Sequence, residues 1–437
     1  MITSPAFSGK RYAVLGLARS GRAAVEALLA SGAEVLAWDN REEARQAFAG
    51  RVELADPVKT DLTGFAGVVV SPGVPLNTHP IKPHAYSFGV PVIGDIELFA
   101  KARADLPPHK VVGITGTNGK STTTALVHHI LKTAGVPTTM GGNIGLPILE
   151  QEPLPEGGVY VLELSSYQID LTYSLDCDVA VLLNITPDHL DRYDGDFEKY
   201  AAAKARLFEM QSPGSKALLY DDPRDASDVI LWMMDDFEDG EWPILADVIG
   251  MVRISLDGLT LASSLRGPHN HANASAAFYT GTYLGISEPQ MEAALRTYPG
   301  LPHRMERVAE ISGVAYINDS KGTNTAASAP ALAAFDNVHW IVGGLAKEQG
   351  LGECEAQLGH VKAAYTIGAA GEDFARLLEN RVSIKRSITL EQAVFDASNA
   401  AERGDTILLS PACASFDQYR DFEARGDHFR SLVEALA

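Results

Sequence analysis

The chain has 437 residues, a formal net charge of −20, 46% hydrophobic residues and 21% charged residues. This length suits roughly two to four domains, each with its own core. The acidic balance argues against nucleic acid or an anionic membrane as the main partner, but a local glycine loop can still bind a phosphorylated small molecule. The cysteines lack metal or disulfide spacing, and no hydrophobic signal core or membrane-length apolar run is present. These features predict a cytoplasmic protein without membrane insertion.

Residues 1–104 have the pattern of a Rossmann-like domain. Its elements follow in order: a strand at 12–15, a glycine turn at 16–21, a helix at 23–30, a strand at 35–38 and a strand at 68–70 that leads into Ser71-Pro72-Gly73. The first turn reads Gly-x-Ala-x-x-Gly, a weakened dinucleotide fingerprint. It either binds a nucleotide or sugar nucleotide, or its glycines serve only the packing of helix against strand.

Residues 105–300 begin with the strongest signal in the chain. A β-branched strand at 111–115 runs into Gly116-Thr117-Asn118-Gly119, and Lys120-Ser121 then opens an apolar-periodic helix. Glycines let backbone N–H groups approach phosphate oxygens, while the helix start and the lysine add positive potential. Ser121 is placed to ligate Mg²⁺. The glycines stand at 113, 116 and 119, which departs from the strict P-loop spacing, yet the pattern predicts a nucleotide site.

Further strands at 159–164, 179–185 and 217–220 predict a parallel sheet covered by helices. Ligands gather at the carboxyl ends of such strands, where Glu163 and Asp188-His189 stand. Glu163 is a candidate metal ligand or a solvated strand end, and His189 is a candidate ligand or a structural histidine. Lys204, in a helix at 197–209, reads from the sequence alone as an ordinary solvated lysine. The acidic stretch 221–241 reads as a solvated face.

The third segment, 301–437, is again α/β, with strands at 314–317, 338–343 and 405–409. Arg304 is a candidate phosphate clamp. The polar run 319–324 follows an apolar strand and therefore lies at a strand end. Before this segment, Asn270 and Asn273 carry amides that can recognise a base edge.

These motifs, in this order, resemble the Mur ligases, the ATP-dependent amide ligases that build the peptidoglycan stem peptide. The resemblance rests on Gly-Thr-Asn-Gly-Lys-Ser-Thr at 116–122, Glu163-Leu-Ser-Ser, Asn184-Ile-Thr-Pro-Asp-His-Leu-Asp, His269-Asn270-x-x-Asn273, Leu301-Pro-His-Arg and Asp319-Ser-Lys. It covers essentially the whole chain. The C-terminal stretches 409–419 and 422–429, and the lack of an Asp-Asn-Pro-Arg motif, favour the member of the family that adds D-glutamate.

The resemblance implies three domains: a Rossmann-like UDP-substrate domain (1–104), a central P-loop-type ATPase domain with a mostly parallel sheet (105–300) and a Rossmann-like amino-acid domain (301–437). It implies a monomer that acts on UDP-N-acetylmuramoyl-L-alanine, D-glutamate and ATP with two Mg²⁺ ions. The carboxylate would be phosphorylated to an acyl phosphate and attacked by the amine through a tetrahedral intermediate. The domains would have to close, because an acyl phosphate hydrolyses in open water.

The resemblance also implies the following site residues. The UDP-substrate would contact Leu17, Ala18, Arg19, Ser20, Asp39, Arg41, Ser71, Gly73, Asn143, Ser165 and Gln168. ATP would contact Gly116, Thr117, Asn118, Gly119, Lys120, Ser121, Thr122, Asn270, Asn273, Arg304 and Asp319. The metal ligands would be Ser121, Glu163, His189 and a carbamylated Lys204; the amino acid would contact Lys321, Thr323, Lys347, Ser415 and Phe422. Lys120, His189, Lys204, Arg304 and Lys321 would be catalytic.

One position departs from the family pattern, which usually has Asp-Lys-Gly after the Gly-Gly turn. Here Gly343-Gly344 is followed by Leu345-Ala346-Lys347-Glu348. Two other classes of protein stay open from the sequence: a nicotinamide-dependent dehydrogenase, which would use the 16–21 turn, and a P-loop switch or motor without an acceptor. Within the family, another Mur ligase or a folylpolyglutamate synthetase is the alternative.

Overall fold

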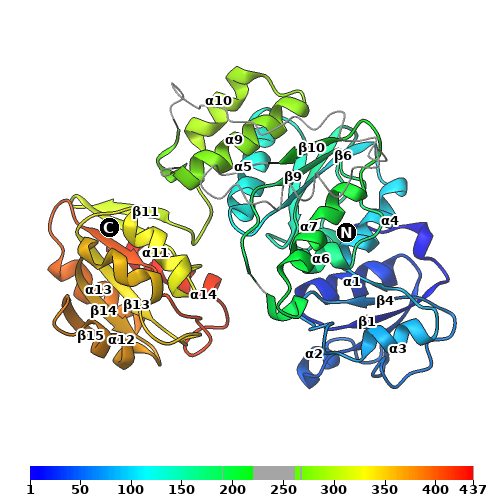
Figure 1. Ribbon diagram of the computed structural model, residues 1–437, viewed down its shortest axis with the longest axis horizontal. Helices are drawn as coiled ribbons and strands as arrows, with labels where there is room; N and C mark the ends of the chain where they lie inside the picture. Colours follow the sequence, from blue (N-terminus) through cyan, green and yellow to red (C-terminus); the bar gives the residue numbers. More distant parts are fainter. Residues whose placement is uncertain (189, 220–260, 266–267, 437) are drawn as a thin grey trace. The chain divides into compact units, whose positions relative to one another are not determined.

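The computed structural model describes residues 1–188, 190–219, 261–265 and 268–436 (Figure 1). Contacts between residues divide this part of the chain into two compact units. One holds the described residues of 1–219 together with 268–296, and the other holds 261–265 together with 297–436. None of the helices in the described part is both long and apolar enough to cross a membrane.

The first unit contains two five-stranded parallel sheets. The strand order of the first sheet is β3-β2-β1-β4-β5. Its strands are β1 (Arg11–Leu15), β2 (Glu34–Trp38), β3 (Glu53–Leu54), β4 (Phe65–Val70) and β5 (Val92–Ile93), and its helices are α1 (Arg19–Ala30), α2 (Glu42–Gln46), α3 (Ile81–Ser87) and α4 (Asp95–Ala102). The chain leaves β1 toward β2 on one side and later places β4 on the other. This switch point is where open α/β sheets bind ligands.

The second sheet has the order β10-β9-β6-β8-β7. Its strands are β6 (His109–Thr115), β7 (Thr138–Gly142), β8 (Gly158–Glu163), β9 (Val179–Leu182) and β10 (Lys216–Leu219). Helices α5 (Lys120–Thr133), α6 (Ser166–Asp170), α7 (Phe197–Glu209), α9 (Pro268–Tyr283) and α10 (Glu288–Thr297) accompany it. The central strand β6 is buried over its last five residues, as expected for a strand covered on both faces.

The second unit is built on one six-stranded sheet with the order β11-β12-β16-β13-β14-β15. Its strands are β11 (Glu306–Ile311), β12 (Val314–Asn318), β13 (Val338–Gly343), β14 (Val361–Ile367), β15 (Ser383–Ile388) and β16 (Thr406–Leu409), with helices α11 (Thr325–Ala333), α12 (Gly371–Leu378), α13 (Leu390–Ala400) and α14 (Phe422–Glu434). β11 pairs antiparallel with β12, and the other pairings in this sheet are parallel.

The predicted α/β class with parallel sheets is confirmed, whereas the division into three domains at 104 and 300 stays a prediction. Several predicted boundaries differ from the structure by a few residues, and two of these differences affect loops that are predicted to bind ligands. The helix expected at 23–30 begins at Arg19, so part of the glycine turn is already helical. The strand expected at 179–185 ends at Leu182, which frees the following residues for other contacts. The acidic stretch 221–241 lies outside the described residues.

A buried carboxyl group at the start of α4 makes the stability of the first unit depend on pH. Asp95 is 3% exposed. Burial raises the pKa of Asp95 to about 6, although the Ser20 hydroxyl and nearby N–H groups partly oppose this. None of these contacts has the geometry of a full hydrogen bond to either carboxylate oxygen. Because the folded-state pKa lies above that of the unfolded chain, this group favours folding below about pH 4, and that contribution is lost as the pH rises through about 6.

We therefore expect Asp95→Asn to stabilise the protein by roughly 2–3 kcal/mol at pH 8 and about half as much at pH 5. Melting temperatures of variant and wild type at the two pH values measure this. Asp61→Asn is the control, because Asp61 is exposed and its hydrogen bonds to Thr63 lower its pKa. An equal gain at both pH values would show that the charge of Asp95 is not what costs stability.

Candidate active site

The phosphate loop joins β6 to α5 and depends on two glycines with positive φ. Gly116 has φ +149° and Gly119 has φ +83°, a region that other residues disfavour. A Cβ atom on Gly119 would lie 2.3 Å from Oδ1 of Asn273. Helix α5 then begins at Lys120 without a side-chain cap, which leaves the positive end of a 14-residue helix at the loop. The predicted strand–loop–helix is therefore present.

Asn184, just beyond β9, holds the phosphate loop in shape. Its Oδ1 accepts the N–H groups of Thr117 at 3.1 Å and Asn118 at 2.8 Å. The Thr117 hydroxyl donates to the carbonyl of Thr186 at 3.0 Å and accepts the Thr186 N–H at 2.9 Å. We assigned no role to Asn184 or Thr186 from the sequence. Their position at a strand end was the available signal.

Two lysines converge on this loop. Nζ of Lys120 donates to the carbonyls of Gly116 at 2.9 Å and Thr117 at 2.8 Å. Lys204 on α7 is 1% exposed, and its Nζ donates to the same Gly116 carbonyl at 2.9 Å. Burial, reinforced by the charge of Lys120, lowers the pKa of Lys204 to about 7. The interpretation of Lys204 as an ordinary solvated lysine is therefore wrong, and much of its amine is neutral near pH 7.

Glu163, the last residue of β8, is held so that one carboxylate oxygen stays without a partner. It is 2% exposed. Asn143 donates to its Oε1 at 3.0 Å, whereas Oε2 is buried and has no hydrogen-bond partner among the described residues. A buried carboxylate oxygen of this kind is a suitable ligand for a hard cation, so the residues present fit Mg²⁺. Among the described residues no group of three His, Cys, Asp or Glu side chains could hold a metal; His189 lies outside them.

The two asparagines predicted for the base lie on α9 and are both 5% exposed. Asn273 donates to Asn270 at 3.3 Å and accepts the Thr123 hydroxyl of α5, also at 3.3 Å. Asn273 thus packs α9 against the helix that starts at the phosphate loop. Ser121 and Thr122 are 6% and 8% exposed on that helix.

The predicted UDP loop of the first sheet is organised around Asp39. This carboxylate accepts the N–H groups of Leu17 at 2.7 Å and Arg41 at 2.9 Å. Burial alone would raise the pKa of Asp39, but these bonds and the Arg41 charge lower it overall. Leu17 is 1% exposed, so its side chain is packed inside the protein, and its N–H donates to Asp39.

The turn after β4 packs directly on this loop. The Ser71 hydroxyl donates to the Gly16 carbonyl at 2.8 Å, and a Cβ on Gly16 would lie 2.9 Å from the Ser71 side chain. Other residues predicted for the UDP-substrate lie at the starts of α1 and α6. Ala18 precedes α1, Ser20 lies in its first turn, Arg19 donates to the Gly145 carbonyl at 2.6 Å, and Ser165 and Gln168 bond each other as the capping box of α6.

In the second unit, polar groups gather at the carboxyl ends of β12, β13 and β16. Asp319 follows β12 and accepts the Ser410 hydroxyl at 2.7 Å. Burial raises the pKa of Asp319 to about 6, although Ser410 and Arg304 oppose this. Nε of Arg304 is buried and has no hydrogen-bond partner among the described residues.

The residues predicted for the incoming amino acid surround the same strand ends. Nζ of Lys347 donates to the Thr323 hydroxyl at 3.2 Å, and Nζ of Lys321 lies 5.6 Å from the ring centre of Phe422. Ser415 follows β16 and is 3% exposed. Lys347 therefore lies beside Thr323, and its assignment to the amino-acid site stays a prediction.

The residue after Lys347 explains part of the departure from the family pattern. Glu348 accepts both the N–H and the hydroxyl of Thr325 at 2.8 Å and 2.7 Å, which caps the start of α11. The preceding Gly344 has φ +132°, and a Cβ there would lie 2.4 Å from the Ala414 carbonyl. The loop after β13 is thus fixed against the loop after β16.

The sequence did not reveal the buried arginine that ties these loops together. Arg425 on α14 is 1% exposed. It donates to the hydroxyl and carbonyl of Ser320 at 3.0 Å and 2.9 Å and to the Cys413 carbonyl at 3.1 Å. Burial lowers the pKa of Arg425 to about 10. Its spacing with the buried Gly426, Phe429 and Val433 was the available signal.

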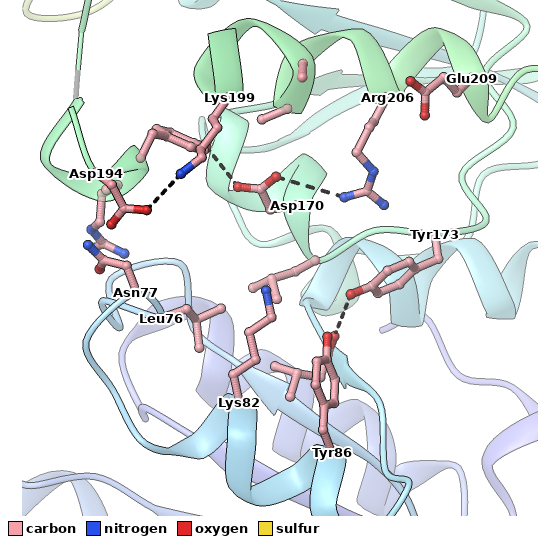
Figure 2. A pocket seen from close by; sticks show the side chains of 16 residues that line it. Leu76, Asn77, Lys82, Tyr86, Asp170, Tyr173, Asp194, Lys199, Arg206 and Glu209 are labelled. Atoms are coloured by element: carbon pink, nitrogen blue, oxygen red, sulfur yellow. Dashed lines mark hydrogen bonds and ion pairs between the residues drawn. The ribbon is translucent and has the colours of Figure 1, made fainter. Parts of the chain in front are cut away.

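A cavity of about 690 Å³ also lies in the first unit, lined by α3, α6, α7 and neighbouring loops (Figure 2). In Figure 2 the side chain of Lys82 points toward Asp170, and the hydroxyl of Tyr86 meets that of Tyr173. None of the predicted site residues that the structure describes lines this cavity.

The parallel sheets and the glycine loop define a phosphate-loop α/β protein. Residues 114–281 match the Mur ligase middle domain, and residues 303–413 match the Mur ligase glutamate ligase domain. The chain is 61% identical to the UDP-N-acetylmuramoylalanine–D-glutamate ligase of Novosphingobium aromaticivorans, over 100% of this chain and 97% of that protein. The chain therefore belongs to the Mur ligase family. The dehydrogenase and the switch or motor are thereby excluded.

Solved structures of more distant proteins have the same fold. The UDP-N-acetylmuramate-alanine ligase MurC of Thermotoga maritima aligns with a TM-score of 0.61 at 14% identity, over 98% of this chain and 100% of that chain. The MurF ligase of the same organism, in complex with ADP, aligns with a TM-score of 0.58 at 17% identity, over 98% and 96% of the two chains.

Proposed function

We propose that this chain is an ATP-dependent ligase that joins D-glutamate to UDP-N-acetylmuramoyl-L-alanine in the synthesis of peptidoglycan precursors, releasing ADP and phosphate. The observation that carries the proposal is the 61% identity, over the full length, to a protein named for this reaction. The phosphate loop, with two glycines that must lack a side chain, supports ATP as the phosphoryl donor.

The first step activates a carboxylate, which does not condense with an amine unaided because oxide is a poor leaving group. An oxygen of the terminal alanine carboxylate attacks the γ-phosphorus of ATP, so that an acyl phosphate forms and ADP leaves. Lys120 and Arg304 would each contribute a cation to stabilise the transferring phosphoryl group. When bound, Mg²⁺ ions neutralise charge on the phosphates. Ser121, Glu163 and His189 would hold them, with Lys204 as a carbamate.

The carbamate proposal for Lys204 is supported by its surroundings. A neutral amine attacks CO₂ and loses a proton, so an ammonium is replaced by a carboxylate that can ligate a cation. The buried, weakly basic Nζ beside the Gly116 carbonyl meets the requirement for a neutral amine near pH 7.

In the second step the D-glutamate amine attacks the carbonyl carbon of the acyl phosphate. The tetrahedral intermediate collapses, the C–O bond to phosphate breaks, and the amine loses a proton. Lys321, Thr323, Lys347, Ser415 and Phe422 would hold the two carboxylates of the amino acid. The hydrogen bond between Lys347 and Thr323 and the packing of Lys321 on Phe422 support this grouping.

Labelled oxygen tests this chemistry directly. If UDP-N-acetylmuramoyl-L-alanine carries ¹⁸O in its terminal carboxylate, the released phosphate should contain one ¹⁸O atom per turnover, since the C–O bond breaks in the second step. Mass spectrometry of the phosphate measures this. Unlabelled phosphate accompanying full amide formation would refute an acyl phosphate.

We expect Ser415→Ala to raise the KM for D-glutamate about tenfold, which corresponds to one lost hydrogen bond to a charged group. The KM for ATP should change less than about twofold, because the lost hydroxyl belongs to the amino-acid site. Ser431→Ala on α14 is the control, since that hydroxyl donates only to the Asp427 carbonyl at the surface. An effect of Ser415→Ala confined to ATP would show that Ser415 has been assigned to the wrong substrate.

A further inference from the structure

One stretch of the first unit touches both predicted binding loops. It comprises 184–188 and the short 3-10 helix η4 (Leu190–Tyr193); residue 189, between them, lies outside the described part. At its beginning, Asn184 and Thr186 hold the phosphate loop through Thr117 and Asn118, as described above. At its end, η4 contacts the turn after β4, where the UDP-substrate is predicted to bind.

The contact at the far end is made by Arg192. Its Nη1 donates to the Val74 carbonyl at 2.9 Å and its Nη2 to the Gly73 carbonyl at 3.2 Å. The guanidinium carbon lies 4.5 Å from the ring centre of Tyr167, so the flat group is fixed on its face as well as at its edge. Beside it, Asn77 donates to the Asp191 carbonyl at 2.8 Å.

The turn after β4, to which Arg192 donates, is itself packed on the glycine loop of the first sheet. Ser71 donates through its N–H to Leu15 at 3.0 Å and through its hydroxyl to Gly16 at 2.8 Å. Hydrogen bonds therefore fix η4 to the turn beside the predicted UDP loop at one end, and residues 184 and 186, a few positions earlier in the chain, to the phosphate loop at the other.

We propose that Arg192 is a positioning residue that couples the two substrate sites: binding at the Gly73 turn and binding at the phosphate loop favour each other through it. The inference rests on the proposed function. A planar fork that spans two successive carbonyls while stacked on a ring transmits a displacement of the turn, whereas a lysine keeps the charge and loses the fork. Coupling of this kind is reciprocal, so it is measurable from either ligand.

The chain contains a matched control. Arg206 on α7 donates to the carbonyls of Ile169 at 3.2 Å and Thr172 at 2.8 Å, and lies 5.2 Å from the ring centre of Tyr173. Figure 2 shows its guanidinium beside Asp170. These contacts are of the same kind as those of Arg192. They stay within the part of the unit built on the second sheet and do not reach the first.

The test uses the full chain and isothermal titration with UDP-N-acetylmuramoyl-L-alanine, with and without Mg²⁺ and a non-hydrolysable ATP analogue. The ratio of the two Kd values is the coupling factor. We expect a factor of at least about 5 for the wild type and for Arg206→Lys, and a factor near one for Arg192→Lys. Asn77→Ala removes the neighbouring bridge from an exposed position and should reduce the factor partway. If Arg192→Lys fails to fold, the coupling factor of Asn77→Ala tests the proposal in its place.

The outcomes separate this inference from the proposed function. Arg192→Lys or, if needed, Asn77→Ala with the wild-type factor would overturn the coupling role. An equal loss of the coupling factor in Arg206→Lys would also overturn it, because the loss would then reflect a general loosening of the protein. A coupling factor of one in the wild type would overturn it as well. Absence of any binding of UDP-N-acetylmuramoyl-L-alanine to the wild type would overturn the proposed function as well.

Discussion

Replacing Lys120 by alanine is expected to lower kcat at least about 10³-fold while leaving the melting temperature nearly unchanged. The ammonium stands at the start of α5 and donates to the loop carbonyls of Gly116 and Thr117. It is partly exposed, so its removal opens no core cavity. The loss should appear in kcat, because the charge acts on the phosphoryl group as it transfers.

Lys132→Ala is the matched control for this prediction. Lys132 lies on the same helix, in its last turn, and is exposed. ADP release in the presence of all three substrates measures both variants, and thermal melting monitors the fold. Ligation by Lys120→Ala at a rate close to the wild type would show that the loop does not serve phosphoryl transfer.

Replacing Lys204 by alanine is expected to lower kcat at least about 10²-fold, with partial recovery on addition of formate or acetate. The variant loses a buried group, and a small carboxylate can enter the space beside Gly116 and act in place of the carbamate. Recovery should saturate with the concentration of the acid and be weaker for bulkier acids.

Lys199→Ala controls for the general effect of removing a lysine from α7. Lys199 is exposed and pairs with Asp194 at 3.1 Å, so its loss should leave kcat within about twofold. Full activity of Lys204→Ala, or activation of the control by formate to the same extent, would refute a carbamylated ligand at Lys204.

The sequence predicted those parts of the fold that rest on local patterns. Helix α7 has the predicted bounds Phe197–Glu209, because alanines and a regular apolar face specify it without help from distant residues. The two-residue strands β3 and β5 escaped prediction, since so short a strand is defined by its partner. The early start of α1 at Arg19 was missed because glycine signals a turn locally, while Gly21 is required here by the carbonyl of Gly16, 1.8 Å from where its Cβ would lie.

The residues of the candidate site also divide into those that a local motif predicts and those that depend on distant partners. Lys120 and Glu163 follow from motifs at strand ends, which a sequence displays directly. Asn184, Arg192 and Arg425 act through hydrogen bonds to backbone groups 66 or more, 118 or more and 12 or more residues away. A local sequence pattern does not predict hydrogen-bond partners that are so far away in the chain. Burial also determines the chemistry of Lys204, which depends on exclusion of the amine from water rather than on the residues next to it in the chain.

The most direct test of the account is ADP release by the purified chain with UDP-N-acetylmuramoyl-L-alanine, ATP and Mg²⁺, measured against a panel of D- and L-amino acids. The site predicted around Lys321, Thr323, Lys347 and Ser415 offers partners for two carboxylates. A neutral side chain leaves these donors without a second carboxylate, and the opposite configuration swings one carboxylate away from them. We predict a kcat/KM for D-glutamate at least about 10²-fold above those for L-glutamate, D-alanine and diaminopimelate. Comparable values for D- and L-glutamate, or turnover with another amino acid alone, would contradict the account.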